Sequence, residues 1–312
     1  MKLKNLWHSV VGWLDSSQIA NYQTHTKKDG VQLDWQRSIP FIVFHLACLA
    51  VFAVGWSPVA LGVMVALYFV RMFAITGFYH RYFSHKSFET SRPVQFVMAI
   101  VGNAAVQRGP IWWASHHRHH HKYSDTELDN HSPVQQGFLW SHLGWIFSSH
   151  NIPSRADTVK DLMKYRELRF MDRFDWMVPV MFAVAIFFTG RYLEAYYPGL
   201  HTNGAQLLVW GFFVSTTLLF HGTFFINSLA HVWGRTRYKT TDTSRNNFLL
   251  AIITLGEGWH NNHHHYPNSV RQGFYWWEID ISFYLLKLME KAGLVWNLRP
   301  VPQEKLLENR AA

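Results

Sequence analysis

Four long apolar segments, separated by polar, basic and aromatic sequence, constrain this chain more than any other feature. Each is close to the length that an α-helix, rising about 1.5 Å per residue, needs to cross a hydrocarbon layer about 30 Å thick. Turn-forming residues at 55–57 separate the first two segments, and those at 198–204 separate the last two, so two helical hairpins are expected. The predicted transmembrane spans are 39–54, 58–76, 175–191 and 206–226.

The composition favours a membrane protein over a soluble one. Charged residues make up 16% of the chain, against about 25% in an average soluble domain. The formal net charge of +9 is compatible with a nucleic-acid partner or with the cytoplasmic face of a membrane. The single cysteine, Cys48, excludes an internal disulfide and a cysteine-based zinc site. The first residues lack the features of a cleaved signal peptide, so we expect none.

The positions of lysine and arginine distinguish between these two partners. Of the 29 basic residues, five lie in 1–37, twelve in 77–175 and ten after residue 227. Because loops rich in lysine and arginine stay in the cytoplasm, we expect both termini and the polar regions on that side. The charge then follows membrane sidedness, and no nucleic-acid partner is expected.

The expected fold is an all-α integral membrane protein with four transmembrane helices in two hairpins and a helical cytosolic cap. One domain is expected over 39–312, with the cap formed by 77–174 and 227–300, after an N-terminal cytosolic or interfacial arm over 1–38. Residues 154–173 are charged and predict a surface helix within the cap.

Histidines gather in four places on the expected cytoplasmic side. Neutral imidazole is the commonest metal ligand, and residues spaced i, i+3 and i+4 share one face of a helix. Clusters at this spacing therefore predict a metal site. The groups are His80 and His85 in HRYFSH, five histidines between His116 and His121, Asn227 and His231 in NSLAH, and His260, His263 and His264 in GEGWHNNHHHYP.

The central run allows two registers of the pattern H-x-x-H-H. One register uses His117, His120 and His121. The other uses His116, His119 and His120. Spacing alone does not choose between them.

The number of histidines predicts two metal ions rather than one. A tetrahedral zinc ion uses four ligands, fewer than these groups offer. Soluble di-iron bundles carry a Glu-x-x-His motif on each of two helices, whereas this chain has only Glu257 to His260. An all-histidine site for two metals, beneath a membrane bundle, is the remaining interpretation. Imidazole suits zinc, copper, iron and nickel alike, so the ligands do not name the metal.

Five motifs resemble, in order, those of the membrane-bound fatty acyl desaturases, and most closely the acyl-CoA (stearoyl-type, delta-9) branch. The resemblance covers roughly residues 60–300. The motifs are HRYFSH, HHRHHHKYSDTELDNHSP, GFLWSHLGW, NSLAHVWG and GEGWHNNHHHYP.

This resemblance implies four transmembrane helices, a cytosolic cap and a histidine-ligated centre of two non-haem iron ions. The family's central box is followed by lysine, an aromatic residue and serine, as in Lys122, Tyr123 and Ser124, which selects the first register. It implies that Asn227 reaches one metal through water, and that His265 is an additional histidine. The implied ligands are His80, His85, His117, His120, His121, His231, His260, His263 and His264.

Several residues near these motifs have two interpretations. Three carboxylates either orient ligand imidazoles or cap helices: Asp125, Asp129 and Glu257. Four tryptophans either line an acyl tunnel or pack in the core: Trp112, Trp113, Trp140 and Trp145. Two histidines lie inside the motifs but belong to no ligand box: His131 and His142.

The resemblance implies an O2-dependent desaturase that inserts a cis double bond, at delta-9, into a long-chain acyl-CoA. Electrons would come from an external ferredoxin, rubredoxin or cytochrome b5-like carrier with its reductase, since no fused electron-transfer domain is visible. We expect a multi-pass protein of the bacterial inner membrane rather than of the endoplasmic reticulum.

Three alternatives remain open at this stage. The same scaffold can act as a lipid hydroxylase or ketolase. A desaturase can also use acyl chains bound to phospholipid or to a carrier protein. A metal- or haem-binding membrane protein without catalytic activity is the third, although haem would need histidines inside the spans, where only His45 and His221 occur.

Overall fold

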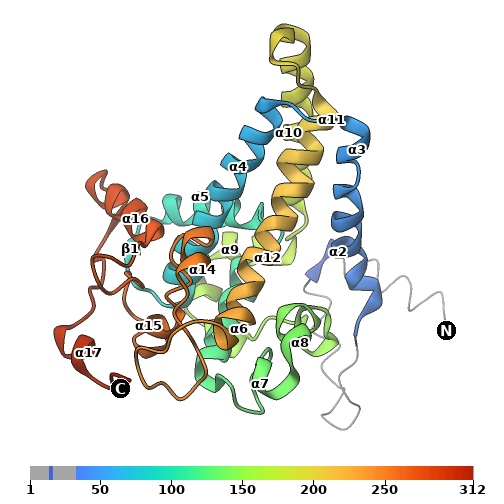
Figure 1. The fold of residues 1–312 in the computed structure, drawn as a ribbon. Helices are drawn as coiled ribbons and strands as arrows, with labels where there is room; N and C mark the ends of the chain where they lie inside the picture. Colours follow the sequence, from blue (N-terminus) through green and yellow to red (C-terminus); the bar gives the residue numbers. More distant parts are fainter. Residues whose placement is uncertain (1–13, 17–32, 312) are drawn as a thin grey trace, which may run out of the picture.

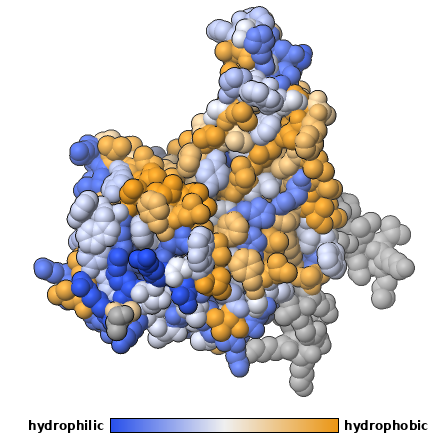
Figure 2. Space-filling view, in the orientation of Figure 1, coloured by the Kyte–Doolittle hydropathy of each residue, from blue (hydrophilic) through white to orange (hydrophobic). Residues whose placement is uncertain are grey.

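The computed structural model (Figure 1) describes residues 14–16 and 33–311. Most of the predicted N-terminal arm over 1–38 therefore lies outside the described residues. Long apolar helices run side by side, and a cap of shorter helices and turns gathers at one end of them. Figure 2 shows hydrophobic residues over the long helices and mostly hydrophilic ones on the lower part of the cap.

Within residues 14–16 and 33–311, three helices are long and apolar enough to cross a membrane: Pro58–Ser84, Met177–Tyr196 and Gly204–Val232. The first consists of α4 (Pro58–Phe73) and the π-helix η2 (Ala74–Ser84), and the second is α10 (Met177–Tyr196). The third is built from α11 (Gly204–Gln206), the π-helix η8 (Leu207–Val214), α12 (Ser215–Asn227) and α13 (Leu229–Val232).

The first predicted span, 39–54, lies in two consecutive helices. It consists of α2 (Trp35–Cys48) and α3 (Val51–Val54), and its apolar part, Ser38–Val54, is below the length of the other three. A turn at 49–50 interrupts it, and Gly55 ends it with a φ of 66°. Ser57 then begins α4, because its side chain accepts a hydrogen bond from the Ala60 N–H at 3.1 Å.

The second predicted span ends later than expected. We expected the helix to stop at residue 76, with His80 after it, but η2 continues it to Ser84. Its i→i+5 hydrogen bonding widens the turns, a feature often found at functional sites. His80 therefore projects from the helix itself, and His85 follows directly at its C-terminal end.

Arg71 lies in the interior of the helix bundle, with 1% of its surface exposed. Its guanidinium donates hydrogen bonds to the Ala104 carbonyl at 3.0 Å, to Thr216 Oγ1 at 2.6 Å and to Ser215 Oγ. A buried charge in an apolar bundle needs such partners. Arg71 thus ties α4 to α12 and to the cap.

The cap contains helices from both polar regions. Its first part holds α5 (Arg92–Asn103), α6 (Pro110–Tyr123), α7 (Pro133–Gln136), α8 (Phe138–His142) and α9 (Arg166–Arg173). Short 3-10 turns lie between them and after α10: η3 (Gly144–Phe147), η4 (Ser149–Asn151), η5 (Ala156–Val159), η6 (Leu162–Lys164) and η7 (Pro198–Leu200). Its second part holds α14 (Phe248–Ile253), α15 (His260–His265), α16 (Ile281–Lys291) and α17 (Gln303–Leu307).

Two local features differ from the sequence predictions. An antiparallel pair of two-residue strands, β1 (Glu89–Thr90) and β2 (Val295–Trp296), joins the two parts of the cap, so the fold is mostly rather than wholly helical. The charged stretch 154–173 is not one surface helix, because 3-10 turns break it and α9 buries Leu168 and Met171. Apolar residues within this stretch pack into the core and override its charged pattern.

Two glycines of the long helices differ sharply in their surroundings, which gives a test of the bundle packing. A Cβ at Gly190 would lie 2.5 Å from the Asn203 carbonyl oxygen, whereas one at Gly62 meets nothing within 4 Å. We expect Gly190→Ala to destabilise the protein by about 1–3 kcal/mol through overpacking. Gly62→Ala should be neutral or slightly stabilising, because alanine favours helix. Thermal aggregation midpoints in detergent measure both, and equal midpoints for the two variants would contradict the packing described.

Candidate metal centre

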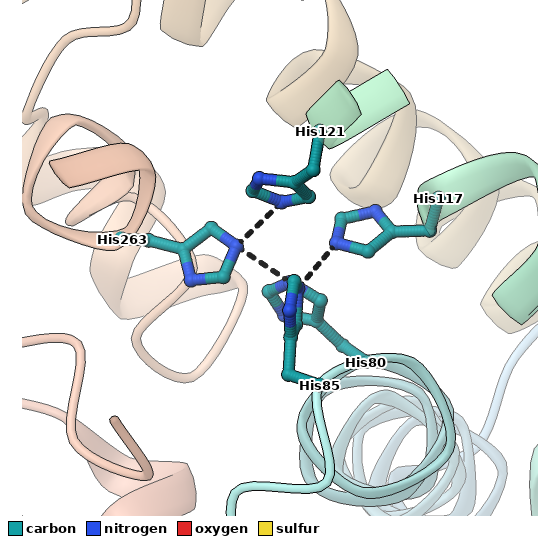
Figure 3. Close-up of side chains that lie close together, drawn as sticks. All are labelled: His80, His85, His117, His121 and His263. Carbon is teal, nitrogen blue, oxygen red and sulfur yellow. Dashed lines mark hydrogen bonds between the residues drawn. The ribbon is translucent and has the colours of Figure 1, made fainter. Parts of the chain in front are cut away.

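The nine histidines predicted as ligands lie in two groups. Within each group the nearest ring nitrogens all lie within 4.8 Å of one another. Figure 3 shows the first group, in which the rings from three separate segments point toward a common centre. The first group is His80, His85, His117, His121 and His263, and the second is His120, His231, His260 and His264.

Helix α6 contributes to both groups. His117 and His121, one turn apart, face the first group, and His120 faces the second. Pro110 begins this helix, where its fixed φ suits the first turn and its missing N–H is not needed. One H-x-x-H-H box therefore contributes to both histidine groups, which the spacing did not predict.

Helix α15 also contributes to both groups, but with two histidines in the second group and one in the first. His260 and His264, one turn apart, face the second group, and His263 faces the first. His231 completes the second group from α13, with its Nε2 at 3.1 Å from His260 Nε2. The two boxes, from segments more than a hundred residues apart, thus face each other across two adjacent sites.

In the first group, the imidazole Nε2 atoms lie within hydrogen-bonding distance of one another. Nε2 of His85 lies 2.8 Å from that of His117. Nε2 of His263 lies 3.0 Å from that of His80 and 2.9 Å from that of His121. Such convergence of imidazole lone pairs on one point is the arrangement that a bound metal cation stabilises.

Four carboxylates contact the Nδ1 atoms of ligand candidates. Glu257 pairs with His80, and Asp242 lies 2.7 Å from His264 Nδ1. A carboxylate that accepts the Nδ1 proton leaves Nε2 unprotonated and fixes the ring, as is usual for metal-bound histidines. The remaining two pairs are Asp129 with His120 at 3.1 Å and Asp125 with His231 at 3.4 Å.

These contacts favour the orienting interpretation of the three carboxylates over helix capping. Asp242 was missed by the sequence analysis, because it lies in a polar loop without a motif and only the tertiary fold brings it to His264. In the second group, Nε2 of His120 and Nε2 of His264 are buried and have no hydrogen-bond partner. Buried nitrogens of this kind need a partner, and a metal ion fits that need.

Burial keeps most of these imidazoles neutral. Burial, reinforced by the neighbouring histidines, holds the pKa values of His85, His121 and His263 well below the ordinary value. A neutral imidazole has the free lone pair that metal binding requires. Burial alone would raise the pKa of Asp129, but the contact with His120 outweighs it and lowers that pKa. The carboxylate is therefore ionised and able to orient its histidine.

The alternative register of the central run has other partners. His116 Nε2 lies 3.1 Å from the Pro153 carbonyl oxygen, and His119 Nε2 lies 2.9 Å from that of Leu128. His265 Nε2 lies 2.8 Å from the Lys305 carbonyl oxygen. These three histidines bond to backbone carbonyls and belong to neither group.

The residues set aside in the sequence have structural roles nearby. His131 packs against His120 with the rings tilted and their centroids 4.3 Å apart, and it forms a third candidate group with His120 and Asp129. His142 Nε2 lies 3.0 Å from His221 Nδ1, and His221 Nε2 lies 3.0 Å from His45 Nε2. The histidines of the expected spans therefore bond to one another rather than to either group.

A cavity of about 630 Å³ connects the histidines with the long helices. Four ligand candidates line it, together with Asn227 at the end of α12. Apolar residues of α2, α4, α10, η8 and α12 form one part of its wall. Of the four tryptophans, Trp112, Trp113 and Trp145 line it, whereas Trp140 does not. The ligand candidates in the wall are His80, His117, His120 and His260.

A sequence model of the family described as "Fatty acid desaturase" matches residues 54–299. The chain belongs to the fatty acid desaturase family. It is therefore an oxidoreductase of fatty acyl chains, in a family known for non-haem iron, and its histidine groups are able to bind metal.

Relatives with different substrates are similarly close. An sn-2 palmitoyl-lipid 9-desaturase of Nostoc sp. (strain 36) is 37% identical over 88% of this chain and 93% of its own. The delta-9 acyl-lipid desaturase 2 of Arabidopsis thaliana is 39% identical over 88% of this chain and 85% of its own. An acyl-CoA 5-desaturase of Anemone leveillei is 39% identical over 83% of this chain and 77% of its own.

Removing a ligand candidate should remove metal. We expect His120→Ala and His264→Ala to lower the metal bound per chain strongly, because each deletes an inward-facing nitrogen of the second group. His116→Ala and His265→Ala are matched controls and should keep most of the metal. Elemental analysis of the purified full-length variants provides the measurement. Full metal content in both His120→Ala and His264→Ala would refute the assignment.

Asp242→Asn tests the carboxylate that sequence analysis missed. The loss of its contact with His264 should weaken metal binding about 10–100-fold, the usual effect of removing such a partner. Asp157→Asn, at an exposed aspartate of η5, is the control. Competition with a coloured chelator measures the affinity. Equal affinity in the two variants would show that Asp242 does not support the site.

Proposed function

We propose that this protein is an O2-dependent di-iron desaturase that inserts a cis double bond into a long-chain fatty acyl substrate. The observation that supports this most strongly is that both histidine groups contribute to the wall of one largely apolar cavity. Its volume, about 630 Å³, is within the range of ligand-binding cavities. An acyl chain in this cavity would pass directly beside the metal-binding nitrogens.

The reaction removes one hydrogen from each of two adjacent methylene groups. O2 takes up these two hydrogens together with two electrons and two protons, and the products are the double bond and two water molecules. Acid and base side chains do not break an unactivated C–H bond, and two bound iron ions would supply the oxygen-dependent redox chemistry that this needs. The nine histidines would hold them, five around one ion and four around the other, with Asn227 reaching one through water.

The residues of the chain itself position the substrate and exclude water. Trp113 stacks on His117, with ring centroids 5.1 Å apart, and so covers one side of the first group. Gln107 donates a hydrogen bond to Thr223 Oγ1 at 2.8 Å, which joins the segment before α6 to α12 in the cavity wall. These polar groups satisfy each other, so the wall presents little unpaired polarity to an acyl chain. The position of the double bond would follow from how far the chain enters.

The finer predictions from the resemblance are delta-9 selectivity, an acyl-CoA substrate and an external electron donor. The delta-9 prediction is supported by two relatives named as 9- or delta-9 desaturases. A ferredoxin, a rubredoxin or a cytochrome b5-like carrier with its reductase would supply the electrons. Since relatives named for acyl-CoA and for acyl-lipid both match, the head group depends on the mouth of the cavity.

We also propose the topology predicted from charge. Ser38–Val54 would form a fourth span. It packs against η8, as the long helices α4 and α10 also do. The distribution of lysine and arginine supports a cytoplasmic cap and cytoplasmic termini. Residues 39–312 would form one domain, in the inner membrane of a bacterium.

Hydroxylation or ketolation of a lipid is the alternative reaction on the same scaffold, and product analysis distinguishes it. We expect a host that expresses this chain to accumulate cis-monounsaturated fatty acids with the bond at delta-9. His264→Ala should give none, and His265→Ala should behave like the wild type. Mass spectrometry of derivatised fatty acids locates the double bonds. Hydroxy or keto products, without new double bonds, would overturn the proposed reaction.

A further inference from the structure

The open side of the cavity lies among apolar helices. Lining residues that are themselves exposed belong mostly to α2 and α10, including Pro40, Val180 and Val184. Val180 and Val184 are each 50% exposed. Val184 lies about 10 Å along α10 from its first residue, at about 1.5 Å per residue. Because α10 is long and apolar enough to cross a membrane, this opening lies at the depth of the hydrocarbon layer.

The surface around the opening is apolar as well. Ile39 and Val43 of α2 are 45% and 49% exposed. Trp176, 37% exposed, lines the cavity just before the first residue of α10. Tryptophan is enriched where a membrane helix meets the head groups. The opening thus extends from the interfacial level at Trp176 into the acyl region.

Among the described residues, two ion pairs lie near the opening. Arg108 and Asp175 both line the cavity and bind each other, with Nε at 2.5 Å from Oδ2. Arg173 binds Asp15 through two hydrogen bonds of 2.6 and 2.9 Å. Among the described residues that line the cavity, Arg108 is the only arginine, and there is no lysine. Coenzyme A carries several phosphate groups, and proteins bind such groups with arginine and lysine side chains.

We infer that the substrate is an acyl chain esterified in a membrane glycerolipid, which enters sideways between α2 and α10 while its head group stays at the interface. This rests on the proposed desaturase function and replaces the acyl-CoA prediction made from sequence. The apolar rim suits lipid acyl chains, and the neutralised Arg108–Asp175 pair suits an ester and a head group without a cluster of phosphates.

The direct test offers both substrates to the same protein. The purified full-length protein, loaded with iron, is placed in vesicles of distearoyl phosphatidylcholine and distearoyl phosphatidylglycerol, with ferredoxin, its reductase, NADPH and O2. Separate vesicles of fully branched lipids receive stearoyl-CoA instead. We expect conversion of the lipid-bound stearoyl chains at a rate at least about tenfold higher than that of stearoyl-CoA. Preferred conversion of stearoyl-CoA would overturn this inference and leave the proposed function standing. Conversion of neither substrate would overturn both this inference and the proposed function.

A pair of variants on one helix tests the route of entry. Val184→Trp fills the opening and should lower conversion of the lipid substrate by about 10²-fold, since small misplacements of a substrate have effects of that size. Met181→Trp adds the same side chain to the neighbouring lipid-facing surface, outside the cavity wall, and should stay within about twofold of wild type.

Crosslinking gives a readout that does not depend on activity. A phosphatidylcholine with a photoreactive group in mid-chain should label the α12 segment around Thr223, which lines the cavity. Labelling should persist in Met181→Trp and disappear in Val184→Trp, and an unchanged metal content shows that each variant is folded. Wild-type conversion and labelling in Val184→Trp would overturn the lateral route.

Discussion

The contact between a buried carboxylate and the Nδ1 atom of a histidine is the interaction on which this centre depends. It occurs four times, at Glu257, Asp129, Asp125 and Asp242. Each contact fixes one ring and leaves its Nε2 facing inward without a proton. The ligand candidates come from η2, α6, α13 and α15, so these contacts also determine how the cap elements pack. Elsewhere in the two groups, burial holds the pKa values of His85, His117, His121, His260 and His263 well below the ordinary value, which favours the neutral form that binds a cation.

The long helices and the cap meet in one continuous element. Met72 and Thr76 line the cavity, and His80 follows four residues later with its ring in the first histidine group. All three lie on the helix Pro58–Ser84, which changes from α4 to the π-helix η2 between Met72 and Thr76. The same helix therefore carries part of the apolar wall and the first ligand candidate, His80. This continuity holds the cavity and the histidine groups in a fixed relation.

Much of the site was predictable from local spacing. The i, i+3, i+4 boxes contain six of the nine histidines, whereas the resemblance to the desaturase motifs supplied the full ligand set and selected the register. The assignment of histidines to groups was not predictable, because His120 and His121 are adjacent in sequence but face different groups. Asp242 could not be found, since no sequence rule relates a loop aspartate to His264. The extension of the second span to Ser84 was also missed, because hydropathy falls at His80 while the backbone remains helical.

By itself, the sequence determined the membrane class and the residue types of the candidate metal centre, and its charge distribution predicted the side on which the histidines lie. Hydropathy, charge distribution and short spacings carry this information, because each depends only on neighbouring residues. The tertiary structure alone decided which nitrogens share a metal position, which carboxylates orient them and where the cavity opens. Val184 and Arg108 lie far apart in the chain, and only the packing of the helices places both in the wall of one cavity. Contacts of this kind depend on how helices associate, and no local pattern contains that information.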